Sequence, residues 1–248
     1  MKLVPFVLGH GPWIDGFRAA IDDALGADGG AVVKDVLDDD SADFFALVNA
    51  ANARAFGGLS MPAWVQLDCA TLPTAMVGFA MKARELDASL VDDLAARAGV
   101  PVGDDDLVPV AEYCALPTPE PGHVVGFSLF SLVAGLGLRV KALGLFSLQA
   151  RVQTGITQAD PLRPLQGALR THCRLGPLVV EKRGVRVHSK PGTTLVYRLQ
   201  VPPSSTLAAL GRGALTRVPF SGTTTKKAGL DDGDTLVDVA ADGFVVAA

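Results

Sequence analysis

Two cations, Arg139 and Lys141, stand inside an apolar segment, GLGLRVKALGL, at residues 135–145. If this segment is a strand, alternation places both cations on one face, about 7 Å apart, among aliphatic side chains. A lysine that is partly desolvated beside a second cation has a lowered pKa. Its neutral amine can then attack a carbonyl group and form a Schiff base. The alternative interpretation is that both cations reach water at the rim of a sheet.

A second set of cations follows in the segment LRTHCRLGP, where Arg170, His172 and Arg174 alternate with other residues. On a strand these three side chains share one face, and the guanidinium fork suits a carboxylate or a phosphate. A solvated strand face is the alternative interpretation. The segment VRVHSKP, residues 185–191, has the same two interpretations.

Motifs for metals and nucleotides are weak. The four histidines are scattered, and the acidic run at residues 104–106 lacks the alternating oxygen ligands of a calcium loop. We therefore expect neither a metal nor a cofactor. The segment VNAAN, residues 48–52, resembles part of the macro-domain signature for ADP-ribose. It lies inside a helical pattern and lacks the glycine-rich loop that follows in that family, which favours a polar or capping role for Asn49 and Asn52.

Composition narrows the class of protein. The chain has 248 residues and a formal net charge of −4, which argues against a nucleic-acid partner. Three widely spaced cysteines form no disulfide framework and indicate a reducing compartment, so we expect a cytoplasmic protein. The longest uncharged apolar stretch, residues 124–138, is shorter than the roughly 20 residues that a membrane-spanning helix needs. We interpret it as buried strands.

Hydrophobic periodicity predicts an α+β fold in a single domain over residues 1–248, with N-terminal helices packed on a large, mainly antiparallel sheet or barrel-like β body. The helix-rich part is residues 1–100, with helices over 15–26, 41–56 and 85–99 and two short strands around Pro73 within 61–83. The β-rich part is residues 107–201, and a mixed tail at 204–248 contains a helical patch at 204–215 and a strand around 235–239. The predicted strands of the β-rich part cover residues 107–117, 123–132, 138–152, 175–182, 184–189 and 194–202.

The stretch from Glu112 to Gly144 resembles the acetoacetate decarboxylase-like family. Its order is a glutamate in a strand, a proline-containing turn, an apolar strand and then a glycine-led segment with a lysine. The resemblance implies that Lys141 is the Schiff-base amine and that Glu112 is a carboxylate near the substrate. The family's lysine segment typically reads G-R-E-x-x-G-x-P-K-K. This chain lacks the paired lysine and the proline, and its neighbouring cation, Arg139, lies two positions away.

These patterns predict an enzyme, or an enzyme-derived domain, that acts on a small carbonyl or carboxylate compound in the manner of a decarboxylase, a class of lyase. Lys141 is the expected nucleophile, Glu112 the proton-transfer partner and Arg139 the group that lowers the lysine pKa. The apolar run 124–138 is the expected pocket wall. A β-rich module that binds an apolar ligand or self-associates into a homo-oligomer is one alternative, and an ADP-ribose binder is another. The expected substrate-binding residues are Arg170, His172 and Arg174.

Overall fold

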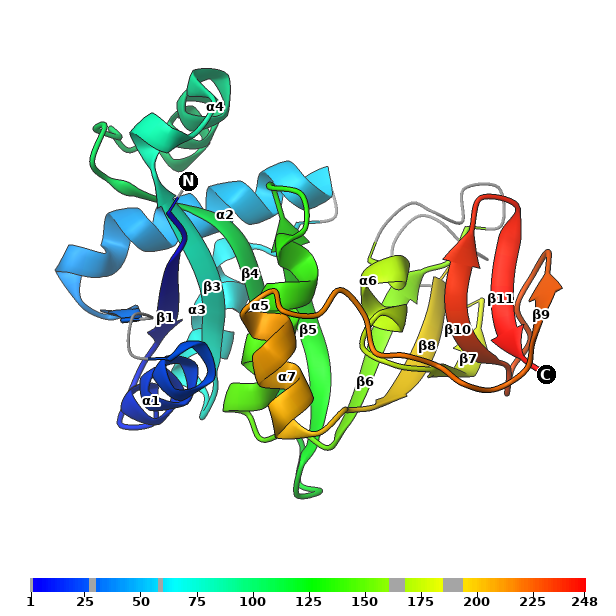
Figure 1. The fold of residues 1–248 in the computed structure, drawn as a ribbon. Helices are drawn as coiled ribbons and strands as arrows, with labels where there is room; N and C mark the ends of the chain where they lie inside the picture. The colour runs from blue at the N-terminus through cyan, green and yellow to red at the C-terminus, as the bar shows by residue number, and fades with distance from the viewer. Residues whose placement is uncertain (1, 27–29, 58–59, 161–167, 185–193) are drawn as a thin grey trace.

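The computed structural model describes residues 2–26, 30–57, 60–160, 168–184 and 194–248. Strands and helices alternate through the N-terminal half, and strands dominate the C-terminal half (Figure 1). The strands are β1 (Val4–Gly9), β2 (Val32–Asp35), β3 (Ala75–Lys82), β4 (Leu107–Pro117), β5 (His123–Ser131), β6 (Val152–Gln158), β7 (Leu178–Arg183), β8 (Thr194–Gln200), β9 (Thr224–Lys227), β10 (Thr235–Ala240) and β11 (Gly243–Ala247). The helices are α1 (Ile14–Leu25), α2 (Ala42–Phe56), α3 (Ala63–Thr71), α4 (Ala88–Ala98), α5 (Leu136–Ser147), α6 (Leu169–Cys173) and α7 (Ser204–Gly211), with short 3-10 helices η1 (Asp39–Ser41) and η3 (Ala83–Glu85).

All described strands belong to one sheet with the order β2-β1-β3-β4-β5-β6-β8-β7-β10-β11-β9. Two neighbouring pairs, β1–β2 and β5–β6, are parallel. The other pairs are antiparallel. The predicted α+β class with a large, mainly antiparallel sheet is therefore confirmed.

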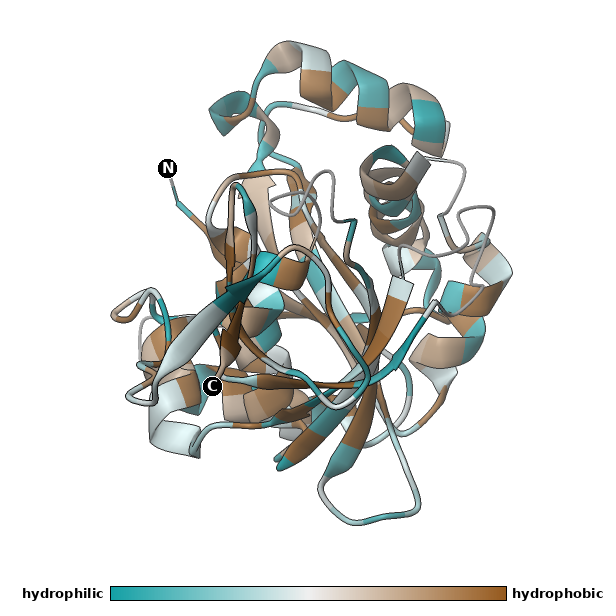
Figure 2. Cartoon of the chain, turned by 90° about the vertical axis from the view of Figure 1, so that its right-hand side faces the viewer, coloured by the Kyte–Doolittle hydropathy of each residue, from teal (hydrophilic) through white to brown (hydrophobic). Residues whose placement is uncertain are grey.

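Helices cover the first part of the sheet on both faces. One core joins the sheet to apolar side chains of α1, α5, α6 and α7, while two smaller cores join it to α2, α3 and α4. Figure 1 shows α1, α5 and α7 in front of the strands and α2 and α3 behind them. In Figure 2 the central strands are largely hydrophobic and the helices carry mixed surfaces, as expected for elements that bury one face.

The three predicted N-terminal helices are confirmed as α1, α2 and α4. In α1, Ile14, Phe17, Ile21 and Ala24 recur at helical spacing and are buried. In α4, Asp87 caps the first turn by accepting from the backbone N–H of Ser89. The predicted strands at 107–117 and 123–132, those at 175–182 and 194–202, the helical patch at 204–215 and the strand near 235 are also present.

Three segments differ from their predicted type. The region 61–83 contains helix α3 and one strand, β3, in place of two short strands. Residues 136–147 form α5, and residues 169–173 form α6, where strands were expected. The sheet also extends into the N-terminal third through β1, β2 and β3.

The error at α5 has a physical cause. This helix is apolar on nearly all sides because it lies between α1, α7 and the sheet, so its sequence shows no amphipathic period. Two of its glycines have a role in the helix itself. Gly135 begins it with a φ of 84°, and a Cβ at Gly144 would lie 2.3 Å from the Tyr113 ring. The helix therefore approaches β4 closely.

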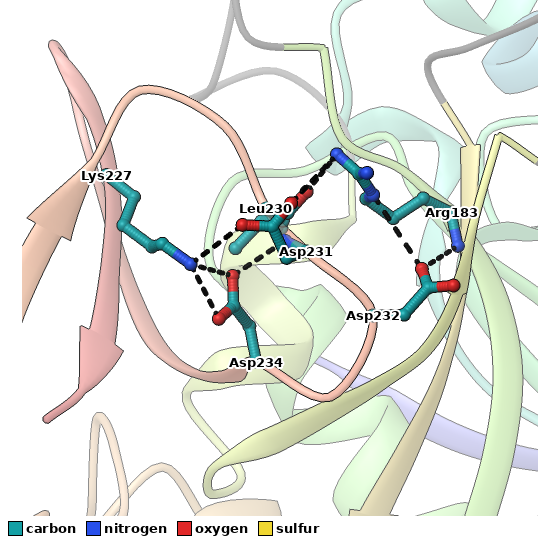
Figure 3. Close-up of polar contacts among 6 residues, drawn as sticks. All are labelled: Arg183, Lys227, Leu230, Asp231, Asp232 and Asp234. Carbon is teal, nitrogen blue, oxygen red and sulfur yellow. Dashed lines mark hydrogen bonds and ion pairs between the residues drawn. The ribbon is translucent and has the colours of Figure 1, made fainter.

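Charged side chains connect β7 and β9 to residues 230–234, which precede β10 (Figure 3). Lys227 of β9 donates to Asp231 and Asp234, and Arg183 of β7 donates to the Leu230 carbonyl at 2.6 Å. These ion pairs are largely exposed, so each contributes little to stability. The predicted strand at 184–189 and the segment VRVHSKP fall largely or wholly outside the described residues. Of the helices described, none has the length and apolar character to cross a membrane.

Candidate functional site

The parallel strands β5 and β6 pair only at their N-terminal ends and then separate. They pair only between His123–Val125 and Val152–Thr154, although β5 stays paired with β4 as far as Ser131. On its other side, β6 stays paired with β8 along its whole length. The facing edges beyond Val125 and Thr154 therefore lack ladder partners among the described residues, and Figure 1 shows the two strands separating. We call this place the strand divergence.

Exposed apolar side chains flank the strand divergence. Val125 is 40% exposed and Ile156 is 50% exposed, which is unusual for large apolar residues inside a sheet. Phe127, 36% exposed, is the extra residue of a bulge in β5, because Ser128 pairs with Cys114 whereas Gly126 pairs with Ala115. Bulges bend a strand, so this one contributes to the parting.

The N-terminus of α5 follows directly from β5. Gly135 is its N-cap residue, and no described side chain caps the helix or places an acidic group in its first turn. Gly135 is exposed, and a Cβ there would meet open space. The first backbone N–H groups of a helix lack intrahelical partners and carry partial positive charge. This end of α5 therefore suits an anion at the carboxyl end of β5, beside the strand divergence.

A buried polar network lies behind the strand divergence, on the α5 face of the sheet. The Lys141 side chain is fully buried, and its Nζ lies 2.5 Å from His172 Nδ1. Lys141 Nζ also donates to Tyr197 Oη at 3.3 Å, and Gln153 Nε2 of β6 donates to the same oxygen at 3.0 Å. The His172 and Tyr197 rings stack at 4.8 Å. Helices α5 and α6 and strands β6 and β8 thus meet at one cluster.

Two polar atoms near this network have no hydrogen-bond partner among the described residues. Gln153 Oε1 and Tyr113 Oη are both buried and unbonded among the described residues. Both side chains reach the space beside Gly126 of β5, where an added Cβ would lie 2.3 Å from Gln153 Nε2 and 3.6 Å from Tyr113 Oη. Buried polar atoms without partners are costly, so each calls for a ligand or water.

Burial disfavours the charged forms of the ionisable groups in the network. Desolvation lowers the pKa of Lys141 well below its usual value, and it lowers the pKa of His172 in the same way. Desolvation also raises the pKa of Tyr197, and it raises that of Cys173 to about 12. Burial therefore favours the uncharged form of both the amine and the imidazole in this network.

Arg139 is not a neighbour of Lys141. Because the segment is helical, residues two positions apart point in different directions. Arg139 instead donates to the Gly211 carbonyl at 2.9 Å and lies over the Phe79 ring. Burial, rather than a second cation, lowers the lysine pKa.

Glu112 belongs to a different cluster on the opposite, α2-facing side of the sheet. Its Oε2 accepts from the Ser128 hydroxyl at 2.9 Å, and Ser128 Oγ accepts from Asn52 of α2 at 3.2 Å. Glu112 is 1% exposed, and its Oε1 has no described partner. Desolvation raises its pKa to about 7, against the lowering by Ser128. The structure brings His172 to Lys141, but it does not bring Glu112 there.

The other predicted residues are dispersed. On α6, Arg170 is exposed, whereas Arg174 follows the helix and its carbonyl accepts from Val218. Asn52 belongs to the Glu112 cluster, and Asn49 donates to the Phe45 carbonyl within α2. No group of metal ligands occurs among the described residues. Two grooves, of about 670 and 440 Å³, lie elsewhere and are lined by none of Lys141, His172 and Glu112.

Sequence analysis missed Tyr113, Gln153 and Tyr197. Tyr113 and Tyr197 lie in strands that were predicted, whereas Gln153 lies in β6, of which only the first residue fell in a predicted strand. Each of the three is a polar residue among buried apolar neighbours. A polar side chain at an inward-facing strand position was the available signal, because such residues need partners in the core.

Comparison with known proteins identifies no family for this chain. No family model matches this chain, and no curated protein matches it. Among solved structures, the aminoglycoside 6'-N-acetyltransferase from Enterococcus faecium aligns over 67% of this chain and 96% of that chain, with 9% sequence identity and a TM-score of 0.41. A TM-score of this size does not identify a shared fold.

Proposed function

We propose that this protein binds a coenzyme A thioester at the strand divergence and transfers its acyl group. The observation that carries the proposal is the parting of β5 and β6 beside the uncapped N-terminus of α5. In open sheets, ligands bind outside the carboxyl ends of strands, where the connections diverge. Two buried atoms without partners at the same place, Tyr113 Oη and Gln153 Oε1, also favour a ligand.

The chemistry of the ligand follows from what the divergence offers. The N-terminus of α5 offers backbone N–H groups to phosphate. The free edges of β5 and β6 offer main-chain donors and acceptors, which pair with an extended chain of amides as an added strand would. Coenzyme A combines phosphates with an amide-bearing arm that ends in a thiol. Its thioester would then lie near Gly126 and the polar network.

The matched test uses Gly137, in the first turn of α5. A Cβ there meets only ordinary contacts at 3.7 Å, so Gly137→Ala fits, and Gly137→Asp adds a carboxylate to the same Cβ position. An aspartate in the first turn also favours the helix, but it repels phosphate. Titration calorimetry with acetyl coenzyme A should show binding to wild type and Gly137→Ala, with a loss of about tenfold or more in Gly137→Asp. Equal binding by all three proteins, or none by wild type, would refute the proposal.

Amine catalysis through Lys141 is the second candidate. The buried amine, with its lowered pKa and its contact with His172, supports attack on a carbonyl compound, forming an imine and releasing water. In this version His172, rather than Glu112 or Arg139, is the neighbour that exchanges a proton. Borohydride trapping with a panel of keto acids should add mass at Lys141, and no adduct in wild type would exclude the Schiff base.

The remaining expectations stay predictions. They are the decarboxylase-like resemblance, the binding of an apolar ligand, self-association, the cytoplasmic location and the binding of ADP-ribose. For ADP-ribose, Asn49→Ala should abolish the heat of titration if that prediction holds.

A further inference from the structure

We propose that Lys141 is a self-acylation site that takes one acyl group from the thioester held at the strand divergence. This inference rests on the proposed function, because the donor must first bind there. It goes beyond that function, since the acceptor is a residue of this chain and the product is a covalently modified protein.

Position favours Lys141 as the acceptor. Its Nζ contacts Tyr197 Oη, which accepts from Gln153, and the Gln153 side chain occupies the space beside Gly126. The lysine is thus linked by two hydrogen bonds to the edge where β5 and β6 part. An acyl group that replaces the Gln153 amide in this space would reach the Tyr197 hydroxyl, which the amine contacts from its other side.

The surroundings of Lys141 keep its amine nucleophilic. No carboxylate among the described residues pairs with it, and its partners there are His172 and Tyr197. Two surface lysines differ, because Lys82 pairs with Asp105 and Lys226 pairs with Asp242. Ammonium groups held by carboxylates are poor nucleophiles. The modification should therefore favour the buried lysine over these two surface lysines.

The reaction balances without another reagent. The Lys141 nitrogen attacks the thioester carbonyl, a C–N bond forms and the C–S bond breaks. His172 Nδ1, 2.5 Å from the amine, is placed to accept the proton that the nitrogen loses. That proton ends on the departing thiol. The products are an amide at Lys141 and free coenzyme A, so each chain reacts once.

Intact-protein mass spectrometry after incubation with acetyl coenzyme A tests the inference, together with peptide mapping and calorimetry on the same sample. We expect a gain of one acetyl group per chain, mapped to Lys141. The gain should be absent from Lys141→Met and from Lys141→Arg, and it should persist in Lys82→Met. Because mapping of the wild type needs no variant, the test does not depend on the variants folding.

The failures are distinguishable. If acetyl coenzyme A binds but Lys141 gains no acetyl group, or only surface lysines do, the self-acylation is wrong and the proposed function stands. If calorimetry detects no binding at all, the proposed function fails, and the inference fails with it. A gain at Lys141 that is the same in Gly137→Asp as in wild type would also overturn it, since the donor would not be acting from the strand divergence.

Discussion

Lys141 and Glu112 are two buried ionisable residues on opposite faces of the same sheet. Neither has an oppositely charged partner among the described residues, and burial shifts the pKa of each toward the neutral form. Their neighbours differ. Lys141 belongs to a network of an imidazole, a phenol and an amide that reaches the strand divergence. Glu112 has a serine hydroxyl and one oxygen without a partner.

Burial of an ionisable residue without an opposite charge therefore does not by itself identify a functional site. Both residues meet that criterion. Lys141 has, in addition, a neighbour placed to take its proton and a connection to strand edges that a ligand can reach. For this reason we assign the chemistry to the lysine side and treat Glu112 as a destabilising group whose effect depends on pH.

The largest expected effect on stability is that of Glu112→Gln. The pKa of Glu112 is raised from 4.5 to about 7, so the folded state holds a proton that the unfolded state releases between these values. The wild type therefore loses stability as pH rises from about 4.5 to about 7. Glu112→Gln should increase the free energy of unfolding by about 3 kcal/mol at pH 8 and change it little at pH 4.

Urea unfolding at the two pH values measures this difference. The neighbouring Cys114 and Tyr113 have pKa values raised well above their usual ones, so they do not titrate in this range in the folded protein. An equal gain in the free energy of unfolding at pH 4 and pH 8 would mean that the pKa of the Glu112 carboxyl is not raised. Glu112 would then not be comparable with Lys141 as a buried group shifted toward its neutral form.

For Lys141→Met, we expect the opposite dependence of stability on pH. The pKa of Lys141 is lowered, so below 10.5 the unfolded state binds a proton that the folded state does not. The wild type should therefore gain stability as pH rises toward 10.5. Lys141→Met should remove that slope.

Urea unfolding of both proteins at pH 7.5 and 9.5 tests the slope. Cys173 also titrates differently in the two states, but it does so in both proteins, so the difference between them isolates the lysine. Parallel curves for wild type and variant would show that the amine is charged in the folded state, and self-acylation would then lose its nucleophile.

Much of the fold could be predicted from the sequence. Amphipathic spacing located α1, α2 and α4, and alternation with proline and glycine boundaries located β4, β5 and β8. The same rules failed at α5, where burial on nearly all sides removes the period that distinguishes a helix from a strand. The single-domain interpretation stays a prediction.

The site was predicted in part for the wrong reason. Lys141 stood out as a cation in an apolar run, and His172 stood out among cations, but each was placed on a strand. A helix directs Arg139 away from Lys141, so the proposed pair of cations does not form. Which residues of distant strands reach Lys141 depends on sheet order, and neither Gln153 nor Tyr197 could be connected to it from local patterns.

The smallest effect on stability should come from Tyr113→Phe, and Tyr197→Phe is its matched contrast. The Tyr113 hydroxyl has no described partner, so its removal should leave stability unchanged or raise it by up to about 1 kcal/mol. The Tyr197 hydroxyl accepts from both Lys141 and Gln153, and the loss of this hydroxyl should lower the free energy of unfolding by about 1–3 kcal/mol.

Binding of acetyl coenzyme A should nevertheless weaken in Tyr113→Phe if the Tyr113 hydroxyl contacts the ligand. Urea unfolding and calorimetry on both variants decide the point. A Tyr113→Phe variant that is less stable and binds the ligand as tightly as wild type would show that this hydroxyl stabilises the fold and does not contact a ligand at the strand divergence.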